Sequence, residues 1–171
     1  MSILNILYYP DDRLRNIATT VKKIDSKIQN IVHDMFETMY HKKGIGLAAT
    51  QVNINKRIIV IDISRSFSKK ITLINPVILE TSGFIKSEEG CLSIPNQHAF
   101  ISRYKYIKIK ASNIDGKEFE LKNDSLLSVC IQHEIDHLNG KLFIDYLSPL
   151  KRERILKKIK KLQRIKKIRD S

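Results

Sequence analysis

The sequence predicts one domain that combines α-helices with β-strands, and three observations lead to this prediction. The 171 residues fit a single domain of common size. A hydrophobic content of 42% and a charged content of 29% are ordinary for a globular protein, and no apolar run approaches the ~20 residues of a membrane span. Helical and strand patterns occur in the same chain: helices over residues 26–42 and 125–138, and strands over residues 57–63, 71–79, 104–114 and 118–122.

The first predicted elements are a short turn over residues 10–14 and an amphipathic helix over residues 26–42. Apolar side chains of this helix recur at i, i+3, i+4, i+7, i+8 and i+11, so one face is expected to pack on the core. Asp25 or Ser26 can cap its start, and Gly44 can end it.

Two strands follow, joined by a polar connection over residues 64–70. Pro76 has no N–H to donate to a ladder, so it is expected at an edge or an end of a sheet. Asp115-Gly116 predicts a hairpin turn between the last two strands.

Two stretches that contain glycine are predicted as loops, residues 44–51 and 88–95. Small residues in the first let its backbone approach another group closely, and Gln51, its only long polar side chain, is expected to point inward. The spacing of its glycines fits neither phosphate-binding pattern, which excludes nucleotide binding there. The second loop carries Cys91.

The helix over residues 125–138, with Asp124 as its expected cap and Gly140 at its end, contains the pattern His133-Glu134-x-x-His137. Two histidines four residues apart on a helix lie on one face, where they can bind one metal ion, and the glutamate can exchange a proton with a water molecule. The helix is apolar nearly all round, which predicts burial. Histidines paired with backbone carbonyls in a purely structural role are the alternative.

A catalytic site of this kind needs a third protein ligand and an open position. Cys91, Cys130 and the acidic residues are the candidates. Cys130 is expected to pack in the core, whereas a loop can present the Cys91 thiolate. The start of the chain does not have the pattern of a signal peptide, so we expect a cytoplasmic protein with reduced thiols.

Three stretches resemble, in order and spacing, the signature motifs of bacterial peptide deformylases, and the enterobacterial type in particular. They are Gly-Ile-Gly-Leu-Ala-Ala-Thr-Gln at 44–51, Glu-Gly-Cys-Leu-Ser at 89–93 and Gln-His-Glu-Ile-Asp-His at 132–137. The resemblance implies an α+β fold in which short mixed or antiparallel sheets pack around a central metal-binding helix, followed by a C-terminal helix. It also implies hydrolysis of the formyl group of N-formylmethionine on newly synthesised proteins, with release of formate.

The same resemblance implies roles for individual residues. Cys91, His133 and His137 would bind the metal, with water in the fourth position, and Glu134 would be the general acid/base. The Gln51 amide and the Leu92 backbone N–H would stabilise the oxyanion. Further implied roles are substrate binding by Ile45, Gly46, Val129 and Cys130, and orientation of the ligands by Glu89 and Asp136.

The resemblance implies Fe²⁺ as the metal, with Ni²⁺, Co²⁺ or Zn²⁺ as substitutes. Thiolate and imidazole ligands by themselves are also compatible with zinc. The sequence departs from the family where an arginine often follows the cysteine motif, since Gln97-His98 stands there, and at Ser87, where a pocket residue is often apolar. These departures bear on substrate affinity and not on the reaction.

The basic charge of the chain is concentrated at its end. Residues 151–171 hold 11 Lys/Arg against two acids, so this segment carries +9 of the net charge of +13. We expect a catalytic domain over residues 1–150 and a basic helix over 151–171 that docks on ribosomal RNA or protein, where nascent formyl-Met chains emerge. A merely solvated charged helix is the alternative. No membrane partner and a monomeric state are expected.

Two other functions fit some of these features. A His-Glu-x-x-His metalloendopeptidase would share the metal, the water and the glutamate, and would differ in its substrate. A ribosome- or RNA-binding module with a structural metal is disfavoured, because structural sites usually have four protein ligands and the sequence offers three.

Overall fold

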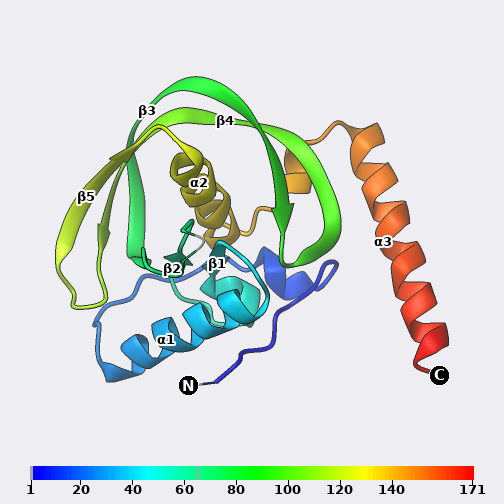
Figure 1. Cartoon of the computed structure of the whole chain (residues 1–171), viewed down its shortest axis with the longest axis horizontal. Coiled ribbons are helices and arrows are strands. Elements are labelled where there is room, and N and C mark those ends of the chain that lie inside the picture. The colour runs from blue at the N-terminus through cyan, green and yellow to red at the C-terminus, as the bar shows by residue number, and fades with distance from the viewer. Residues whose placement is uncertain (1, 65) are drawn as a thin grey trace.

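The protein is described by a computed structural model that covers residues 2–64 and 66–171 (Figure 1). One sheet and three α-helices make up the fold, with short 3-10 helices at Asp12–Arg15, Ala49–Val52 and Phe143–Tyr146. The helices are α1 (Ser26–His41), α2 (Leu126–Leu138) and α3 (Pro149–Arg169), and the strands are β1 (Gly46–Ala48), β2 (Ile58–Ile61), β3 (Ile71–Cys91), β4 (Ile94–Ser112) and β5 (Glu118–Asn123). The predicted α+β class, with a central helix and a C-terminal helix, is confirmed.

The five strands form one antiparallel sheet in the order β1-β2-β3-β4-β5. β3 and β4 are 21 and 19 residues long, and they arch over α2, which lies inside the curve of the sheet (Figure 1). α2 contacts β1, β2 and β4, and α1 contacts β1 and β2. The sheet therefore holds α2 in the middle of the domain, as its apolar surface predicts.

β3 and β4 are longer than the sequence patterns predict, whereas β2 is shorter than the predicted strand over residues 57–63. The segments 44–51 and 88–95 are not loops: β1 and a 3-10 turn occupy the first, and a tight hairpin between β3 and β4 occupies the second. β3 continues past residue 79 because its ladder with β4 runs to the pair Cys91 and Ile94. Pro76 lies just past the last pair of β3 with β2, so β3 is paired on one side only at this point, which agrees with the expected edge position. On the side of β4 it falls at a register shift between Ile74 and Val77, where the ladder does not need its N–H.

The helix ends agree with the expectations at some residues and differ at others. The Asp25 carboxylate caps α1 by accepting the Ile28 N–H at 3.1 Å, as predicted. At the C-terminal end, the left-handed residue is Lys43, with φ +57°, and not Gly44. Ser125, and not Asp124, occupies the N-cap position of α2.

Two of the apolar clusters meet at the sheet, and a third fixes α3. α1 packs on β1 and β2, while α2 packs on the inner face of β2, β3 and β4. Ile155 and Ile159 of α3 pack against Ile94, Ile101 and the 3-10 turn before the helix. None of the described helices is both long and apolar enough to cross a membrane. Residue 65, within the predicted polar connection, lies outside the described residues.

Candidate metal centre and cleft

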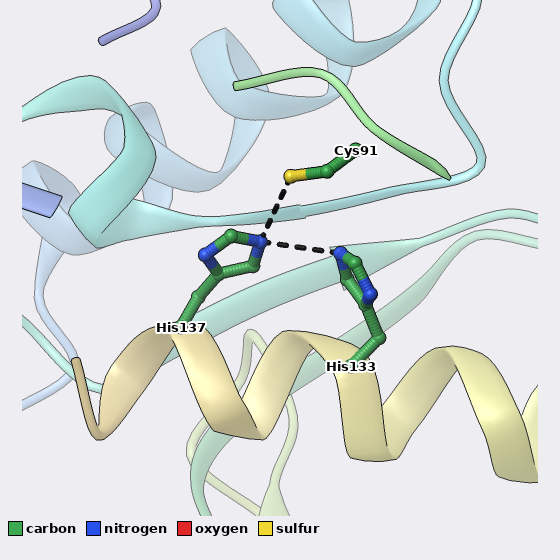
Figure 2. Close-up of side chains that lie close together, drawn as sticks. All are labelled: Cys91, His133 and His137. Atoms are coloured by element: carbon green, nitrogen blue, oxygen red, sulfur yellow. Dashed lines mark hydrogen bonds between the residues drawn. The ribbon is translucent and has the colours of Figure 1, made fainter. Parts of the chain in front are cut away.

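Three side chains converge beside α2, as Figure 2 shows. His133 and His137 lie one helical turn apart, with their Nε2 atoms 3.2 Å from each other. The Sγ atom of Cys91 lies 3.2 Å from Nε2 of His137. The donor atoms of all three residues are within 4.8 Å of one another, and no fourth His, Cys, Asp or Glu of residues 2–64 and 66–171 joins this group.

The hairpin between β3 and β4 presents Cys91 to the histidines. Cys91 ends β3 and pairs with Ile94 at the start of β4, so only Leu92 and Ser93 form the turn. Ile94 is 1% exposed and belongs to the cluster that packs on α3. The thiol is thus held by a sheet ladder and an apolar anchor, which gives it a defined position.

The donor set fits a divalent transition metal ion. Ligand atoms at about 2.0–2.3 Å from one tetrahedral ion lie roughly 3.3–3.6 Å apart, close to the spacing found here. Burial lowers the pKa of His137 well below its ordinary value, which keeps the imidazole in the neutral form that binds metals. A thiolate with two imidazoles and no fourth protein ligand is the donor set of a catalytic rather than a structural site.

Gln51 points into this centre, as the sequence predicts. It is 1% exposed, and its Oε1 accepts the Ala48 N–H at 2.9 Å, which fixes the direction of the amide. Its Nε2 donates to the Ser93 hydroxyl at 3.1 Å and lies 3.5 Å from Cys91 Sγ. The amide N–H₂ group therefore faces the space next to the thiol, and Leu92 lines the cleft beside it.

Glu134 is the candidate proton carrier. It is 4% exposed, and among the described residues its Oε2 atom has no hydrogen-bond partner. Burial raises the pKa of Glu134 to about 7, so the carboxyl group can both accept and donate a proton near neutral pH. Because Glu134 lines the cleft, its unpaired oxygen is an acceptor available to a water or a substrate N–H.

Glu89 orients one of the two histidines. Its Oε1 lies 2.8 Å from Nδ1 of His133, so the opposite nitrogen, Nε2, faces Cys91 and His137. Among the described residues no hydrogen bond joins the Asp136 carboxylate to either histidine; it accepts instead from Arg103 Nη1, at 2.6 Å. The sequence analysis did not identify Arg103. Its position alternates in phase with Ile101 and Ile107, which face inward, and a charged side chain on a buried face must find polar partners.

A cleft of about 590 Å³ opens onto the three candidate ligands and Glu134. Ile45, Gly46, Val129 and Cys130, which were expected to bind substrate, all line it. The sequence did not identify several other lining residues, among them Tyr8, Lys42, Lys43 and Leu126. Burial raises the pKa of the Cys130 thiol well above its ordinary value, which suits an apolar wall and not a metal ligand.

Close packing explains why glycine occupies two positions of the cleft. A Cβ atom on Gly46 would lie 2.5 Å from Oε1 of Glu134. A Cβ atom on Gly90 would lie 2.7 Å from Cδ2 of His98, whose ring covers that part of the backbone. His98 and Ser87 both line the cleft, so the two departures noted in the sequence belong to its wall.

Comparison with known proteins gives one consistent family. The family model for polypeptide deformylase matches residues 3–153. The chain is 61% identical to a peptide deformylase of Hamiltonella defensa over 99% of both chains. It is also 60% identical to a peptide deformylase of Baumannia cicadellinicola, over 96% of this chain and 98% of that protein.

Solved structures of peptide deformylases resemble this chain over nearly its whole length. The crystal structure of a peptide deformylase from Legionella pneumophila superimposes with a TM-score of 0.93 at 45% identity, over 96% of this chain and 98% of that one. A peptide deformylase from Ehrlichia chaffeensis in complex with actinonin matches with a TM-score of 0.91 at 40% identity, over 96% of this chain and 99% of that one.

Proposed function

Since this chain belongs to the polypeptide deformylase family, it is a metal-dependent hydrolase that removes the N-formyl group from nascent peptides, and we propose that Cys91, His133 and His137 bind its metal ion. The observation that carries this assignment is the convergence of one sulfur and two Nε2 atoms with no fourth protein donor among the described residues. The family does not support the alternative of a metalloendopeptidase.

The proposed metal is Fe²⁺, which is an expectation from the family, and Ni²⁺, Co²⁺ or Zn²⁺ fit the same three donors. When bound, a divalent ion supplies Lewis-acid chemistry, which lowers the pKa of a water molecule toward neutrality and polarises a carbonyl group. The protein residues around the site then perform the remaining tasks.

Glu134 is proposed to move the proton. Its pKa of about 7 allows it to take a proton from the attacking water and to give it to the methionine nitrogen as the formyl C–N bond breaks. The Gln51 Nε2 group, oriented through Ala48 and Ser93, is proposed to donate to the oxygen of the tetrahedral intermediate. The Leu92 backbone N–H, in the turn beside Cys91, is the proposed second donor.

The methionine side chain is proposed to occupy the part of the cleft lined by Ile45, Gly46, Val129 and Cys130. Val129 and Cys130 are 5% and 6% exposed, which supports an apolar, preformed wall for a thioether. Ile45 is 45% exposed, so it is available to be covered by a bound peptide.

Metal binding and turnover test this proposal together. Protein purified without oxygen should contain one metal ion per chain and release formate from formyl-Met peptides. Cleavage of internal peptide bonds without formate release would favour the endopeptidase instead. Formate release by protein in which Cys91 has been replaced, with unchanged metal content, would overturn the ligand assignment.

Residues 1–150 are proposed to carry catalysis and residues 151–171 to dock on the ribosome. Beyond Ile159 every residue of the chain is exposed, and α3 projects from the side of the domain (Figure 1). The exposed part carries lysines and arginines together with Leu162, Ile165 and Ile168, which are 45%, 53% and 74% exposed. Such a surface suits a partner with phosphates and apolar groups.

Charge substitution tests docking better than truncation, because truncation would remove the buried residues Ile155 and Ile159. Replacing Lys160, Lys161, Arg164 and Lys167 by glutamine should reduce co-sedimentation with ribosomes at least about tenfold at moderate salt. The matched control replaces four exposed lysines elsewhere, and it should sediment like the wild type: Lys105, Lys117, Lys122 and Lys141. Equal sedimentation of both variants would refute docking by α3.

The cellular setting follows from the substrate. Nascent formylated chains occur where bacterial translation takes place, so we propose a cytoplasmic location. A monomer is proposed because the cleft and the metal centre are built from one chain. Sedimentation velocity of the purified protein tests the monomer.

A further inference from the structure

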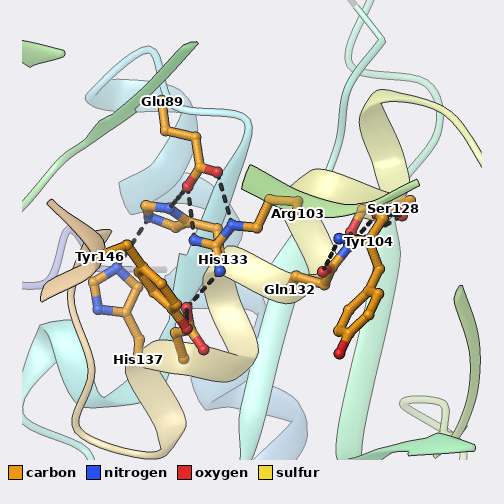
Figure 3. A network of polar contacts seen from close by, with 9 residues as sticks. Glu89, Arg103, Tyr104, Ser128, Gln132, His133, His137 and Tyr146 are labelled. Atoms are coloured by element: carbon orange, nitrogen blue, oxygen red, sulfur yellow. Dashed lines mark hydrogen bonds and ion pairs between the residues drawn. The ribbon is translucent and has the colours of Figure 1, made fainter. Parts of the chain in front are cut away.

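Behind the metal centre, Arg103 is bonded to the carboxylate of Glu89 (Figure 3) and to that of Asp136. Its Nε and Nη2 donate to the two oxygens of Glu89 at 2.7 and 2.8 Å, a bidentate pair. Its Nη1 donates to Oδ2 of Asp136 at 2.6 Å. The side chains of Arg103, Glu89 and Asp136 are only 4%, 5% and 14% exposed, so little water competes for these bonds.

Tyr146, from the 3-10 turn before α3, completes the cluster from the other side. Its hydroxyl donates to Oδ2 of Asp136 at 2.8 Å. The guanidinium carbon of Arg103 lies 4.9 Å from the centroid of the tyrosine ring, within cation–π range. Tyr146, which follows the end of α2 by eight positions, and Arg103 of β4 are thus bonded to the same carboxylate, that of Asp136.

The cluster ends at a candidate metal ligand. Oε1 of Glu89, which Arg103 already holds, is the atom that lies 2.8 Å from Nδ1 of His133. We propose that Arg103 and Tyr146 are positioning residues of the metal centre, acting on His133 through Asp136 and Glu89. The inference rests on the proposed metal centre and adds two residues that touch neither metal nor substrate.

The physical reason is orientation. A carboxylate can rotate about its last bond, but both oxygens of Glu89 are fixed by the guanidinium group, so Oε1 stays aimed at Nδ1. That bond holds a proton on Nδ1 and leaves the lone pair of Nε2 for a metal. Asp136 accepts from the remaining guanidinium nitrogen of Arg103, and it accepts in turn from the Tyr146 hydroxyl. The single positive charge of Arg103 also offsets part of the charge of the buried Glu89 and the partly buried Asp136.

The test measures metal affinity of the full chain rather than turnover. Co²⁺ and Zn²⁺ are titrated against a competing chelator for Tyr146→Phe, Arg103→Lys and the control Tyr104→Phe. Tyr104 stacks on Phe84 with centroids 5.2 Å apart, and no described residue is bonded to its hydroxyl group. The dissociation constant is expected to rise about threefold to tenfold for Tyr146→Phe and about 10–100-fold for Arg103→Lys, but to stay unchanged for Tyr104→Phe.

Additional readouts separate positioning from general destabilisation. The melting temperature of metal-free Tyr146→Phe should lie no more than about 4 °C below that of Tyr104→Phe, as the loss of one hydrogen bond allows, while its Co²⁺ absorption spectrum shifts. In an Asp136→Asn background, where the charged link is gone, Tyr146→Phe should raise the dissociation constant less than twofold. Unchanged metal affinity and spectrum in Tyr146→Phe would overturn the role of Tyr146, and metal affinity that falls only in step with the melting temperature would overturn positioning.

A Cys91→Ser variant separates this inference from the proposal on which it rests. If Cys91→Ser binds metal as the wild type does, the metal centre itself is wrong. If Cys91→Ser loses metal while Tyr146→Phe and Arg103→Lys keep wild-type affinity, the centre stands and only the positioning chain is wrong.

Discussion

Replacing Gly46 by alanine should damage proton transfer while leaving the metal in place. The added Cβ would lie 2.5 Å from Oε1 and 3.1 Å from Cδ of Glu134. Ordinary contact begins at about 3.4 Å, so the carboxylate must move by roughly 0.9 Å, and misplacement by 1 Å can cost about 10²-fold in rate. We therefore expect kcat for formate release to fall about 100-fold.

Backbone strain and the loss of a metal ligand can both be excluded as causes of this fall in kcat. The backbone angle of Gly46 lies outside the left-handed region, so alanine introduces no backbone strain there. The nearest atoms to the new Cβ belong to Glu134 and Cys130, and none belongs to a candidate metal ligand. Metal content should therefore remain at the wild-type value.

Gly44 provides the matched control. A Cβ on Gly44 would lie 2.7 Å from Cδ1 of Leu92, the far end of a flexible side chain that can turn away. Gly44→Ala should therefore lose less than about fivefold in kcat. A kcat of Gly46→Ala within a few-fold of the wild type, or equal losses in both variants, would refute the assignment of Glu134.

The remaining predictions concern the ligands, the carboxylate and the cleft. Glu134→Gln should retain its metal but lose about 10²–10⁴-fold in kcat, because glutamine cannot carry the proton; metal analysis and formate release check both parts. Cys91→Ala should lose stoichiometric metal, measured by elemental analysis of protein purified without oxygen, and retained metal would speak against the thiolate. Lys42 and Lys43 line the cleft, and neither forms an ion pair with a described residue. In a variant with glutamate at both positions, kcat/KM should be compared for two substrates, one with aspartate and one with lysine after the methionine. The ratio of the two kcat/KM values should shift about tenfold in favour of the lysine substrate, and high salt should weaken this effect.

The sequence was most informative where chemistry and periodicity coincide. The bounds predicted for α2 agree with the structure within one residue at each end. Its thirteen residues combine an apolar surface with two histidines at i and i+4, so the two signals for a buried helix coincide there. Gln51 was expected to point inward, and it does. The cap was misassigned to Asp124 because both Asp124 and Ser125 are good caps, and only the fold selects between neighbours.

The missed features depend on long-range contacts. The part of β3 beyond residue 79 is largely exposed, so no apolar alternation marks it as a strand, and its ladder with β4 is what makes it one. The segment 88–95 contains glycine and proline and therefore looks like a loop, but the hairpin needs only two residues to turn. Arg103 draws its partners from β3, α2 and the turn before α3, which no local pattern brings together.

X-ray absorption spectroscopy at the metal edge of the full chain, purified without oxygen, tests the metal centre most directly. We predict one sulfur at about 2.3 Å and two imidazole nitrogens at about 2.0–2.1 Å, with the remaining coordination made by a light atom from solvent. The edge energy also identifies the metal, for which we predict iron. Coordination by nitrogen and oxygen alone, or by a fourth protein ligand, would contradict the assignment of Cys91, His133 and His137 as an open catalytic site.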